Sequence, residues 1–377
     1  MDFDLNDEQR LIKDSIDRLI SDQYQASARA DFMKSPRGFS ESIWRQFAEL
    51  GLLGLTVPEE FGGSGGGPVE TMLIMEAIGR GLTLEPYVSS AVMAAAAIRI
   101  GGSAKAKADL LPGIAEGKMV IALALAEAQS RFDHFDVMTA AAADGTNFRL
   151  TGKKTLVMHG GQADYLIVSA RSSGARRDQN GISLFLVDAA ATGVSRREYP
   201  TLDGMRAAEI TLDNVLVSAD RVLGAPGNGI LLIDAIVDIG IAALSAEAVG
   251  ALEAVHQMTV DYLKTRKQFG VAIGSFQVLQ HRSVDMFVAL DQARSMAMLA
   301  AMMAEDPDIK ERRKAISAAK VQIGNSIRLI TQESVQMHGG IGMTMEYALG
   351  SYVRRLTIIE KSFGDTGHHL AALAAMV

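Results

Sequence analysis

The residues best suited to chemistry lie between Tyr262 and Gln280, in the run YLKTRKQFGVAIGSFQVLQ. Arg266 offers a planar fork of donors that suits a pyrophosphate group. Phe269 offers a flat face on which an adenine can stack, and Gln277 offers an amide for the edge of that base. Basic residues also occur at helix ends because they favour the negative end of the helix dipole. The run therefore indicates either a nucleotide contact or an ordinary helix end.

Carboxylates and histidines are the other side chains that can transfer protons in this sequence. Asp234 and Asp238 lie four residues apart near an expected helix start, where negative charge is favoured for its own sake. Glu360 is expected in the last turn of a helix, where charged residues are usually solvated. His368 and His369 are expected to face solvent or an interface. The sequence has no cysteine, which excludes disulfides and thiolate chemistry, and no metal site is predicted.

Two segments together resemble the flavin-binding signatures of the acyl-CoA dehydrogenase family. The first signature has the form Y-x-x-x-R-x-Q-F-G followed by F-Q, and it begins here at Tyr262. The second is the run QMHGGIG, which begins at Gln336. The resemblance implies that both segments hold the adenine and pyrophosphate end of an FAD whose reactive ring belongs mostly to the neighbouring subunit. The residues assigned to this FAD contact are Arg266, Phe269, Gln277, Gln336 and Gly340.

The resemblance also implies a reaction, because family members oxidise an acyl-CoA between its α and β carbons. A carboxylate base removes the α proton while a hydride leaves the β carbon for the flavin. The base position of the commonest members matches Phe363, and that of isovaleryl-type members matches Gly240. Neither side chain can accept a proton. Glu360, one helical turn before Phe363, is a substitute candidate, and Asp238 matches a position that touches the CoA moiety.

The family's contacts to the reactive ring of the flavin are altered as well. The segment T-E-P-x-x-G-S-D has become AEAQSRFD at residues 126–133, without the threonine, the glycine or the matching serine. The segment W-[IV]-[TS]-N-G has become LVMHG at residues 156–160, which replaces both the indole and the hydroxyl near the ring. The retained residues are those that each subunit lends to its neighbour. The residues that this chain lacks are those with which a family member holds its own flavin ring and transfers the proton.

This pattern is similar to the small subunit of two-component enzymes of the pimeloyl-CoA dehydrogenase type, as are the runs MDFDLNDEQR, TRKQFG and FGDTGHHL. The predicted function is therefore one of two unlike chains in an α2β2 acyl-CoA dehydrogenase, with the base supplied by a homologous large subunit. Two alternatives stay open. One is a homotetramer with an unusual base such as Glu360, and the other is a non-catalytic interaction subunit. The expected electron acceptor is an electron-transfer flavoprotein.

Length and composition indicate a globular protein with more than one core. A chain of 377 residues with 48% apolar and 21% charged residues suggests two or three domains. The formal charge of -7 argues against a nucleic-acid surface. The acidic start MDFDLNDEQR is unlike a signal sequence, so a cytoplasmic location is expected. The apolar stretch 230–244 is interrupted by Asp234, Asp238 and Gly240, so it is expected to be a buried helix and not a membrane span.

Three regions are predicted along the chain: an N-terminal helical domain at 1–118, a middle β-sandwich or barrel at 119–224, and a C-terminal four-helix bundle at 225–377. The first region has a helix start at Asn6 with Gln9 three residues on. Ser40 opens another helix that Gly51 ends, and further helices are expected at 91–100 and 104–114.

The glycine-rich loop 61–68 lacks both G-x-G-x-x-G spacing and a following GK[ST]. We therefore expect a flexible turn that precedes a helix starting near Val69. Strands are predicted at 120–123, 165–168 and 182–187, with a turn at 143–146. Beyond residue 229, apolar residues recur every three or four positions, which predicts an antiparallel helical bundle.

Overall fold

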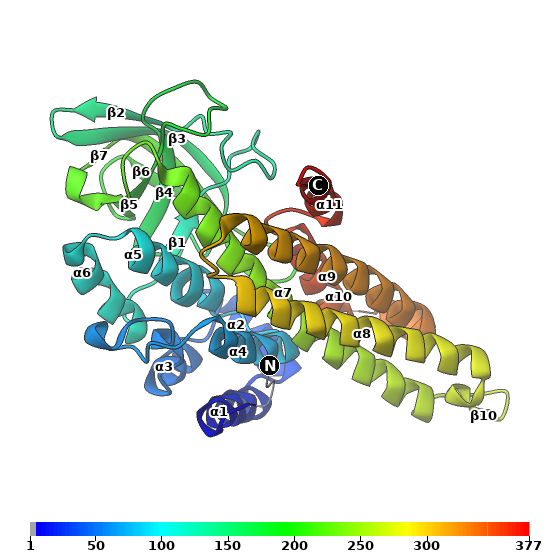
Figure 1. Cartoon of the computed structure of the whole chain (residues 1–377). Coiled ribbons are helices and arrows are strands. Elements are labelled where there is room, and N and C mark those ends of the chain that lie inside the picture. Colours follow the sequence, from blue (N-terminus) through cyan, green and yellow to red (C-terminus); the bar gives the residue numbers. More distant parts are fainter. Residues whose placement is uncertain (1–4, 345, 377) are drawn as a thin grey trace. The chain divides into compact units, whose positions relative to one another are not determined.

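The structure is a computed structural model that describes residues 5–344 and 346–376. The first four residues of the run MDFDLNDEQR lie outside this description. The chain divides into two compact units. The bundle unit comprises Met1–Asp31, Pro68–Thr83 and Ile241–Val377, and the sheet unit comprises Phe32–Gly67 and Leu84–Gly240. Figure 1 labels the elements along the chain. The predicted domain limits after residues 118 and 224 remain predictions.

The bundle unit begins with α1 (Asp7–Gln23), whose start was predicted from Asn6 and Gln9. The Asn6 side chain accepts the Gln9 N–H at 2.8 Å, and the Gln9 side chain accepts the Asn6 N–H at 3.1 Å, which makes a capping box. The other α-helices of this unit are α4 (Pro68–Gly81), α7 (Gly229–Thr265, from Ile241 onward), α8 (Gln277–Met303), α9 (Ile309–His338), α10 (Leu349–Lys361) and α11 (Thr366–Ala374), and its short 3-10 helices are η5 (Ile273–Ser275) and η6 (Gly339–Met343).

Glycines allow α4 and α7 to cross closely. A Cβ on Gly79 would lie 2.0 Å from the Glu247 carbonyl oxygen, and a Cβ on Gly250 would lie 1.9 Å from the Glu76 carbonyl oxygen. The helix α7 is long and apolar enough to span a membrane by length and composition, but 78% of its most apolar window is buried inside the structure. It is therefore the central helix of a bundle, as the interrupted apolar stretch predicts.

Short helices form the part of the sheet unit outside its sheet. Ser40 caps α3 (Glu41–Glu49), and Gly51 follows with a left-handed φ of 73°, as expected. The helix predicted at 91–100 begins earlier, as the π-helix η3 (Tyr87–Ala94), and continues as α5 (Ala95–Gly101). The remaining helices are α2 (Ala26–Lys34), which ends in this unit, η1 (Leu52–Gly54), η2 (Glu59–Phe61), α6 (Ala104–Ala115) and η4 (Ala219–Arg221).

The loop 61–68 is not the flexible turn that we expected. The amides of Ser64 and Gly66 donate to backbone carbonyls of the same unit at 3.0 and 2.7 Å. A Cβ on Gly63 would lie 2.0 Å from the Val57 carbonyl oxygen, so the loop packs tightly on its own backbone. Because these amides are already used, the loop is not a phosphate cradle.

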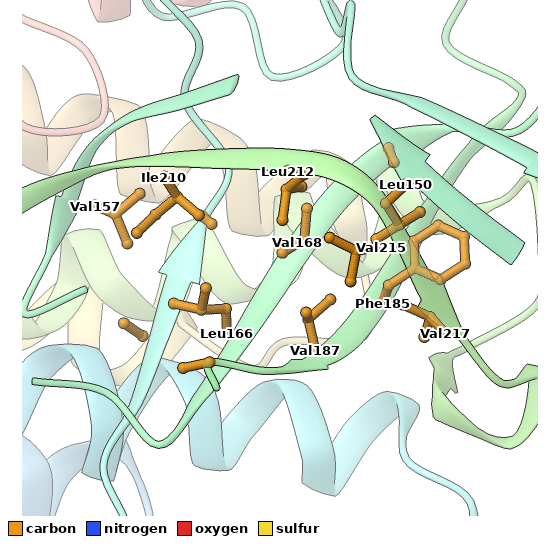
Figure 2. Close-up of a cluster of buried hydrophobic side chains, with 14 of the residues drawn as sticks. Leu150, Val157, Leu166, Val168, Phe185, Val187, Ile210, Leu212, Val215 and Val217 are labelled. Carbon is orange, nitrogen blue, oxygen red and sulfur yellow. The ribbon is translucent and has the colours of Figure 1, made fainter. Parts of the chain in front are cut away.

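The sheet has eight strands in the order β6-β7-β3-β2-β4-β5-β8, and β1 pairs in parallel with β4. The predicted strands are confirmed as β1 (Ile121–Ala124), β4 (Tyr165–Arg171) and β5 (Ile182–Asp188). Figure 2 shows the core cluster inside this sheet, where Ile210 and Leu212 of β7 face Leu166 and Val168 of β4. The strands of this sheet that we did not predict are β2 (Ala140–Asp144), β3 (Asn147–Met158), β6 (Val194–Pro200), β7 (Arg206–Val217) and β8 (Val222–Leu223).

Candidate functional site

The first predicted segment forms a hairpin after α7. Strands β9 (Lys267–Gln268) and β10 (Val271–Ala272) are antiparallel, and Phe269 and Gly270 make the turn with φ of 54° and 82°. Such two-residue turns favour Asn-Gly, because glycine has no Cβ and asparagine tolerates positive φ, whereas a bulky side chain such as Phe is strained there. The Phe269 ring is nevertheless 91% exposed. The chain thus holds an aromatic ring in solvent on a backbone that disfavours it.

The neighbouring residues leave this end of the bundle unit open to an anionic group. Phe276 meets the Phe269 ring edge-on at 6.2 Å between centroids. The helix α8 begins at Gln277 without a side-chain cap; the amides of Leu279 and Gln280 donate to the Phe276 carbonyl, and the positive end of the helix dipole faces the hairpin end of the helix. The exposed guanidinium of Arg266 has no ion-pair partner among the residues that the structure describes.

The second predicted segment ends α9 in a glycine turn. Gln336 is exposed in the last turn of the helix, and Gly339 follows with φ of 61°. A Cβ added to Gly340 would meet nothing within 4 Å, and φ at Gly340 is not positive. The protein's own packing therefore does not require glycine at 340. Open space at this position suits the close approach of a ligand.

The structure brings the two segments together at one end of the bundle unit. The rings of Tyr262 and His338 are stacked, with 4.5 Å between centroids and 26° between planes. Nearby, the Thr259 hydroxyl donates to the Ser334 hydroxyl at 3.0 Å. An ion pair between Arg282 and Glu333 joins α8 to α9. The residues predicted for the FAD contact are all exposed at the ends of these helices: Arg266, Phe269, Gln277, Gln336 and Gly340.

The first predicted base position lies in a tightly held turn. Phe363 is partly buried and has a left-handed φ of 56°, and Gly364 follows at 109°. His369 Nε2–H donates to the Phe363 carbonyl at 3.0 Å, and the Ser317 hydroxyl donates to His369 Nδ1 at 3.2 Å. The expectation that His369 faces solvent or an interface is wrong, because it is only 6% exposed. Burial lowers the pKa of His369 to about 4, so its ring is neutral.

Glu360, the substitute base candidate, is held by the same turn. It accepts the Thr366 N–H at 3.3 Å, the Thr366 hydroxyl at 3.2 Å and the Lys361 ammonium at 3.0 Å. Burial alone would raise the pKa of Glu360, but Lys361 and Thr366 outweigh it and lower the pKa. A general base needs free lone pairs and a pKa near the working pH. The environment of Glu360 therefore favours a structural role.

A buried lysine also supports this turn, and we did not predict it. Lys320 is 2% exposed, and its Nζ donates to the Ile359 carbonyl at the end of α10. Burial lowers the pKa of Lys320 to about 7. Gly324 lies one turn further along α9, and a Cβ there would lie 2.1 Å from the Thr366 hydroxyl. One face of α9 thus fixes the turn that carries Phe363.

The remaining predicted positions lie in the sheet unit. A Cβ on Gly240 would lie 2.8 Å from both Sδ and Cε of Met93, so the second base position is filled by a neighbouring side chain. Asp238 is 4% exposed and lies nine residues after Gly229, the first residue of α7. The helix dipole acts on charges within the first turn of a helix, so it does not explain a buried carboxylate at position 238. The role of Asp238 toward CoA remains a prediction.

The segment 126–133 is anchored by a buried ion pair between Glu127 and Lys154. Lys154 and Glu127 are joined at 2.7 Å, and their side chains are 0% and 3% exposed. The Glu127 carboxylate also accepts the N–H groups of Met138 and Thr139 at 2.8 and 3.0 Å. Burial would raise the pKa of Glu127, but Lys154 and the hydrogen bonds lower it to about 2. The pair therefore remains ionised at neutral pH.

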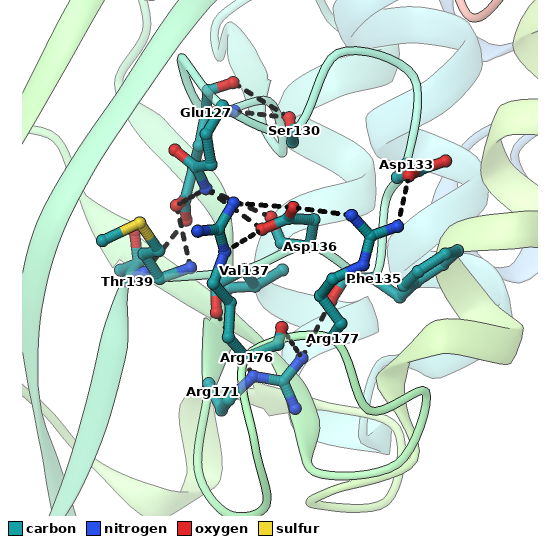
Figure 3. Close-up of polar contacts among 12 residues, drawn as sticks. Glu127, Ser130, Asp133, Phe135, Asp136, Val137, Thr139, Arg171, Arg176 and Arg177 are labelled. Carbon is teal, nitrogen blue, oxygen red and sulfur yellow. Dashed lines mark hydrogen bonds and ion pairs between the residues drawn. The ribbon is translucent and has the colours of Figure 1, made fainter.

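Arginines hold the rest of this loop (Figure 3). Arg176 binds the Asp136 carboxylate with two hydrogen bonds of 2.6 and 2.8 Å. The Arg171 guanidinium donates to the carbonyls of Phe135 and Val137 at 2.8 and 3.2 Å. We did not predict this network from the sequence. The loop is therefore rigid without help from a ligand.

The residues at the hairpin and the glycine turn fit the adenine end of an FAD, whereas those at the positions expected to contact a flavin ring do not fit that ring. At the hairpin and the glycine turn, an exposed ring, an exposed guanidinium and an open glycine match an adenine and a pyrophosphate. At the expected ring end, Leu156 is 56% exposed, and His159 is 3% exposed with its ring edge-on to Phe39 at 6.2 Å. Apolar side chains and a buried histidine cannot replace the missing hydroxyls as donors to a flavin ring.

The fold and the paired segments define a class of acyl-CoA-oxidising flavoproteins. Residues 6–118, 122–215 and 227–377 match the N-terminal, middle and C-terminal domains of acyl-CoA dehydrogenase. The chain therefore belongs to the acyl-CoA dehydrogenase family, whose members are oxidoreductases that act on the CH–CH bond of an acyl-CoA. The predicted order of helical, sheet and helical regions is confirmed.

Individual relatives cover nearly the whole chain. This chain is 28% identical over 373 residues to the probable acyl-CoA dehydrogenase YngJ of Bacillus subtilis (strain 168), and the match covers 97% of this chain and 97% of YngJ. It is similar to a chain of the Tcur3481-Tcur3483 steroid ACAD, with TM-score 0.88, 29% identity and coverage of 98% of this chain and 97% of that one. It also shares its fold with a glutaryl-coenzyme A dehydrogenase, with TM-score 0.92, 24% identity and coverage of 99% and 96%.

Proposed function

We propose that this chain is one of two unlike subunits of an FAD-dependent acyl-CoA dehydrogenase, and that it completes flavin sites whose catalytic base belongs to a homologous larger subunit. The observation that carries the proposal is Phe269, an exposed aromatic ring held on a left-handed backbone three residues after the exposed Arg266. Strained residues persist where function requires them. A ring in this position suits an adenine that another subunit holds at its far end.

The two base positions also support a catalytic base that belongs to the partner subunit. Phe363 lies in a turn fixed by Lys320 and His369, and Met93 fills the space beside Gly240. Glu360 is engaged by Lys361 and Thr366. These residues therefore offer no unengaged carboxylate at either position, and the chain's own part in the reaction is binding.

An apolar face on α8 supports a partner subunit. Val284, Phe287 and Val288 are 58%, 53% and 48% exposed, and their spacing of three and four residues places them on one face of α8, the helix that follows the hairpin of Phe269. Such a continuous exposed face is characteristic of a protein interface. The similarity to the Tcur3481-Tcur3483 steroid ACAD, which is named for two chains, favours an unlike partner over a second copy. An electron-transfer flavoprotein as acceptor, and a cytoplasmic location, belong to the same proposal.

In this arrangement each residue has a definite task. FAD, when bound, supplies the acceptor for the hydride that leaves the β carbon. Arg266 would neutralise the pyrophosphate, Phe269 would stack on the adenine, and Gln277 would bind its edge. Gln336 and the Gly340 backbone would line the opposite side of the dinucleotide. Neither proton removal nor carbonyl polarisation is assigned to this chain.

The test is the FAD affinity of the complex formed with a homologous partner chain. We expect Arg266→Ala to weaken it by about 30-fold to several thousand-fold, from roughly 2–5 kcal/mol for a lost buried charge pair. Lys267→Ala, which removes a neighbouring exposed cation without a donor fork, is the matched control and should have little effect. Equal losses in both variants, or none in either, would reduce Arg266 to a helix-end charge.

A further inference from the structure

A buried histidine joins the two segments of the proposed flavin site, and nothing in the proposed function yet uses it. His338 is 3% exposed at the end of α9. Its Nδ1 lies 2.8 Å from the Ser334 carbonyl, which can only accept, so Nδ1 carries the proton. Its Nε2 lies 3.2 Å from the Tyr347 hydroxyl. In the neutral ring this nitrogen can only accept, so Tyr347 donates to it.

The same ring is stacked on the end of α7. Tyr262, four residues before Arg266, is stacked on His338 at 4.5 Å between centroids and 26° between planes, and the Tyr347 ring is tilted against His338 at 5.0 Å and 49°. A Cβ on Gly342 would lie 3.0 Å from the His338 Cβ, so the glycine turn also closes on this residue. Three chain segments meet at this ring, namely the end of α7, the glycine turn and the approach to α10.

We propose that His338 is a positioning residue, a neutral imidazole with its proton on Nδ1 that holds the Gly339–Gly340 turn in register with the Arg266 hairpin. This inference rests on the proposed function in one respect: it assumes that the glycine turn and the Arg266 hairpin contact the same cofactor. A stacked pair fixes separation and tilt, and the two hydrogen bonds fix rotation of the ring. Both are needed for two exposed segments to present their groups at a constant distance.

Burial supports the neutral state. It lowers the pKa of His338, and the hydrogen bond to the Ser334 carbonyl only partly opposes this. The pKa of the Tyr347 hydroxyl is raised, again first by burial, so Tyr347 keeps its proton and remains a donor. The proton positions around the ring are therefore fixed at neutral pH.

Two measurements on the full chain, neither of which needs flavin, test this inference. Histidine-selective 15N spectra at pH 7 should show His338 as the Nδ1–H tautomer; an Nε2–H tautomer or an imidazolium would overturn the proposal. Hydrogen exchange should then be compared between Tyr262→Leu, which removes the stacked ring, and Tyr262→Phe, which keeps it. In Tyr262→Leu we expect amides at 268–273 and 341–344 to exchange at least 10-fold faster, and in Tyr262→Phe less than 2-fold faster.

Exchange in Tyr262→Leu that stays within 2-fold of the parent in either segment would contradict the role of His338. Should Tyr262→Leu fail to fold, Tyr347→Phe removes only the hydrogen bond to Nε2, and faster exchange limited to 341–344 is the expected result; unchanged exchange there would count against the proposal. Loss of FAD affinity is a separate measurement. If the chain shows the Nδ1–H tautomer and the coupled exchange, but its complexes never bind flavin, the proposed function is refuted and the positioning role of His338 still holds.

Discussion

The side chain of Met93 lies where a side chain on Gly240 would have to be. An added Cβ would lie 2.8 Å from both the sulfur and the terminal methyl of Met93, which is 3% exposed. Met93 belongs to the π-helix η3 (Tyr87–Ala94), and π-helical turns often mark functional segments. The position at which isovaleryl-type relatives are expected to carry a base is therefore occupied by core packing in this chain.

This contact predicts a coupled pair of mutations. Gly240→Ala should destabilise the chain by about 1–3 kcal/mol, as overpacking of a filled core does. In the background Met93→Ala the same change should cost less than about half as much, because the shorter side chain leaves room. Denaturant unfolding of the two single variants and the double variant measures the coupling. Additive effects would show that the flexible methionine simply moves aside.

Gly339 and Gly340, two of the three glycines of the second motif, should respond oppositely to alanine. Gly340→Ala should leave the stability of the chain within about 0.5 kcal/mol, because the added methyl meets no atom, and should weaken FAD binding in the complex. Gly339→Ala, at φ of 61°, should destabilise by about 1 kcal/mol or more through backbone strain. Thermal unfolding and flavin titration separate the two. Normal FAD affinity in Gly340→Ala would remove this glycine from the site.

A single substitution can improve the hairpin while impairing the proposed function. Phe269→Asn creates the Asn-Gly turn that the backbone favours, so amide exchange in β9 and β10 should slow or stay unchanged. FAD affinity of the complex should fall by about 5- to 150-fold, since base stacking on an aromatic ring is worth about 1–3 kcal/mol. Faster hairpin exchange would contradict the turn assignment, and unchanged affinity would contradict the stacking role.

The buried amine of Lys320 predicts a pH dependence of stability. Its pKa is lowered from 10.5 to about 7 by burial, so between these values the unfolded chain binds a proton that the folded chain does not. Stability should therefore gain up to about 1.4 kcal/mol per pH unit from this residue as pH rises from 7 to 10. Lys320→Met should lack this gain. Parallel pH profiles of unfolding free energy in parent and variant would contradict it.

Local signals in the sequence predicted much of this architecture. Asn6 and Gln9 form the expected capping box, Ser40 and Gly51 bound their helix, and the apolar runs at 121–124 and 182–188 are strands. These features depend on neighbours along the chain. The strands β3 and β6 were missed because exposed charged residues interrupt their apolar alternation and their pairing partners are distant in sequence.

The residues of the candidate site that belong to sequence motifs were predictable, whereas those whose properties depend on burial were not. The spacing of Tyr262, Arg266 and Gln336 located both segments, but the stack that joins them depends on His338 from another helix. Lys154 and Lys320 look like surface lysines in the sequence. Only the folded chain shows that both are buried, and burial is what alters their chemistry.

The most direct test of the half-site account is anaerobic reduction of flavin by an acyl-CoA in this chain alone. We predict no acyl-CoA-dependent bleaching of the flavin absorbance for either the parent or Phe363→Glu, and bleaching when a homologous large subunit is added. Phe363→Glu would place a carboxylate in a partly buried turn without a partner, which should lower stability and supply no catalysis. Bleaching of a bound flavin in the parent or in Phe363→Glu without a second chain would contradict the account and establish a self-sufficient enzyme.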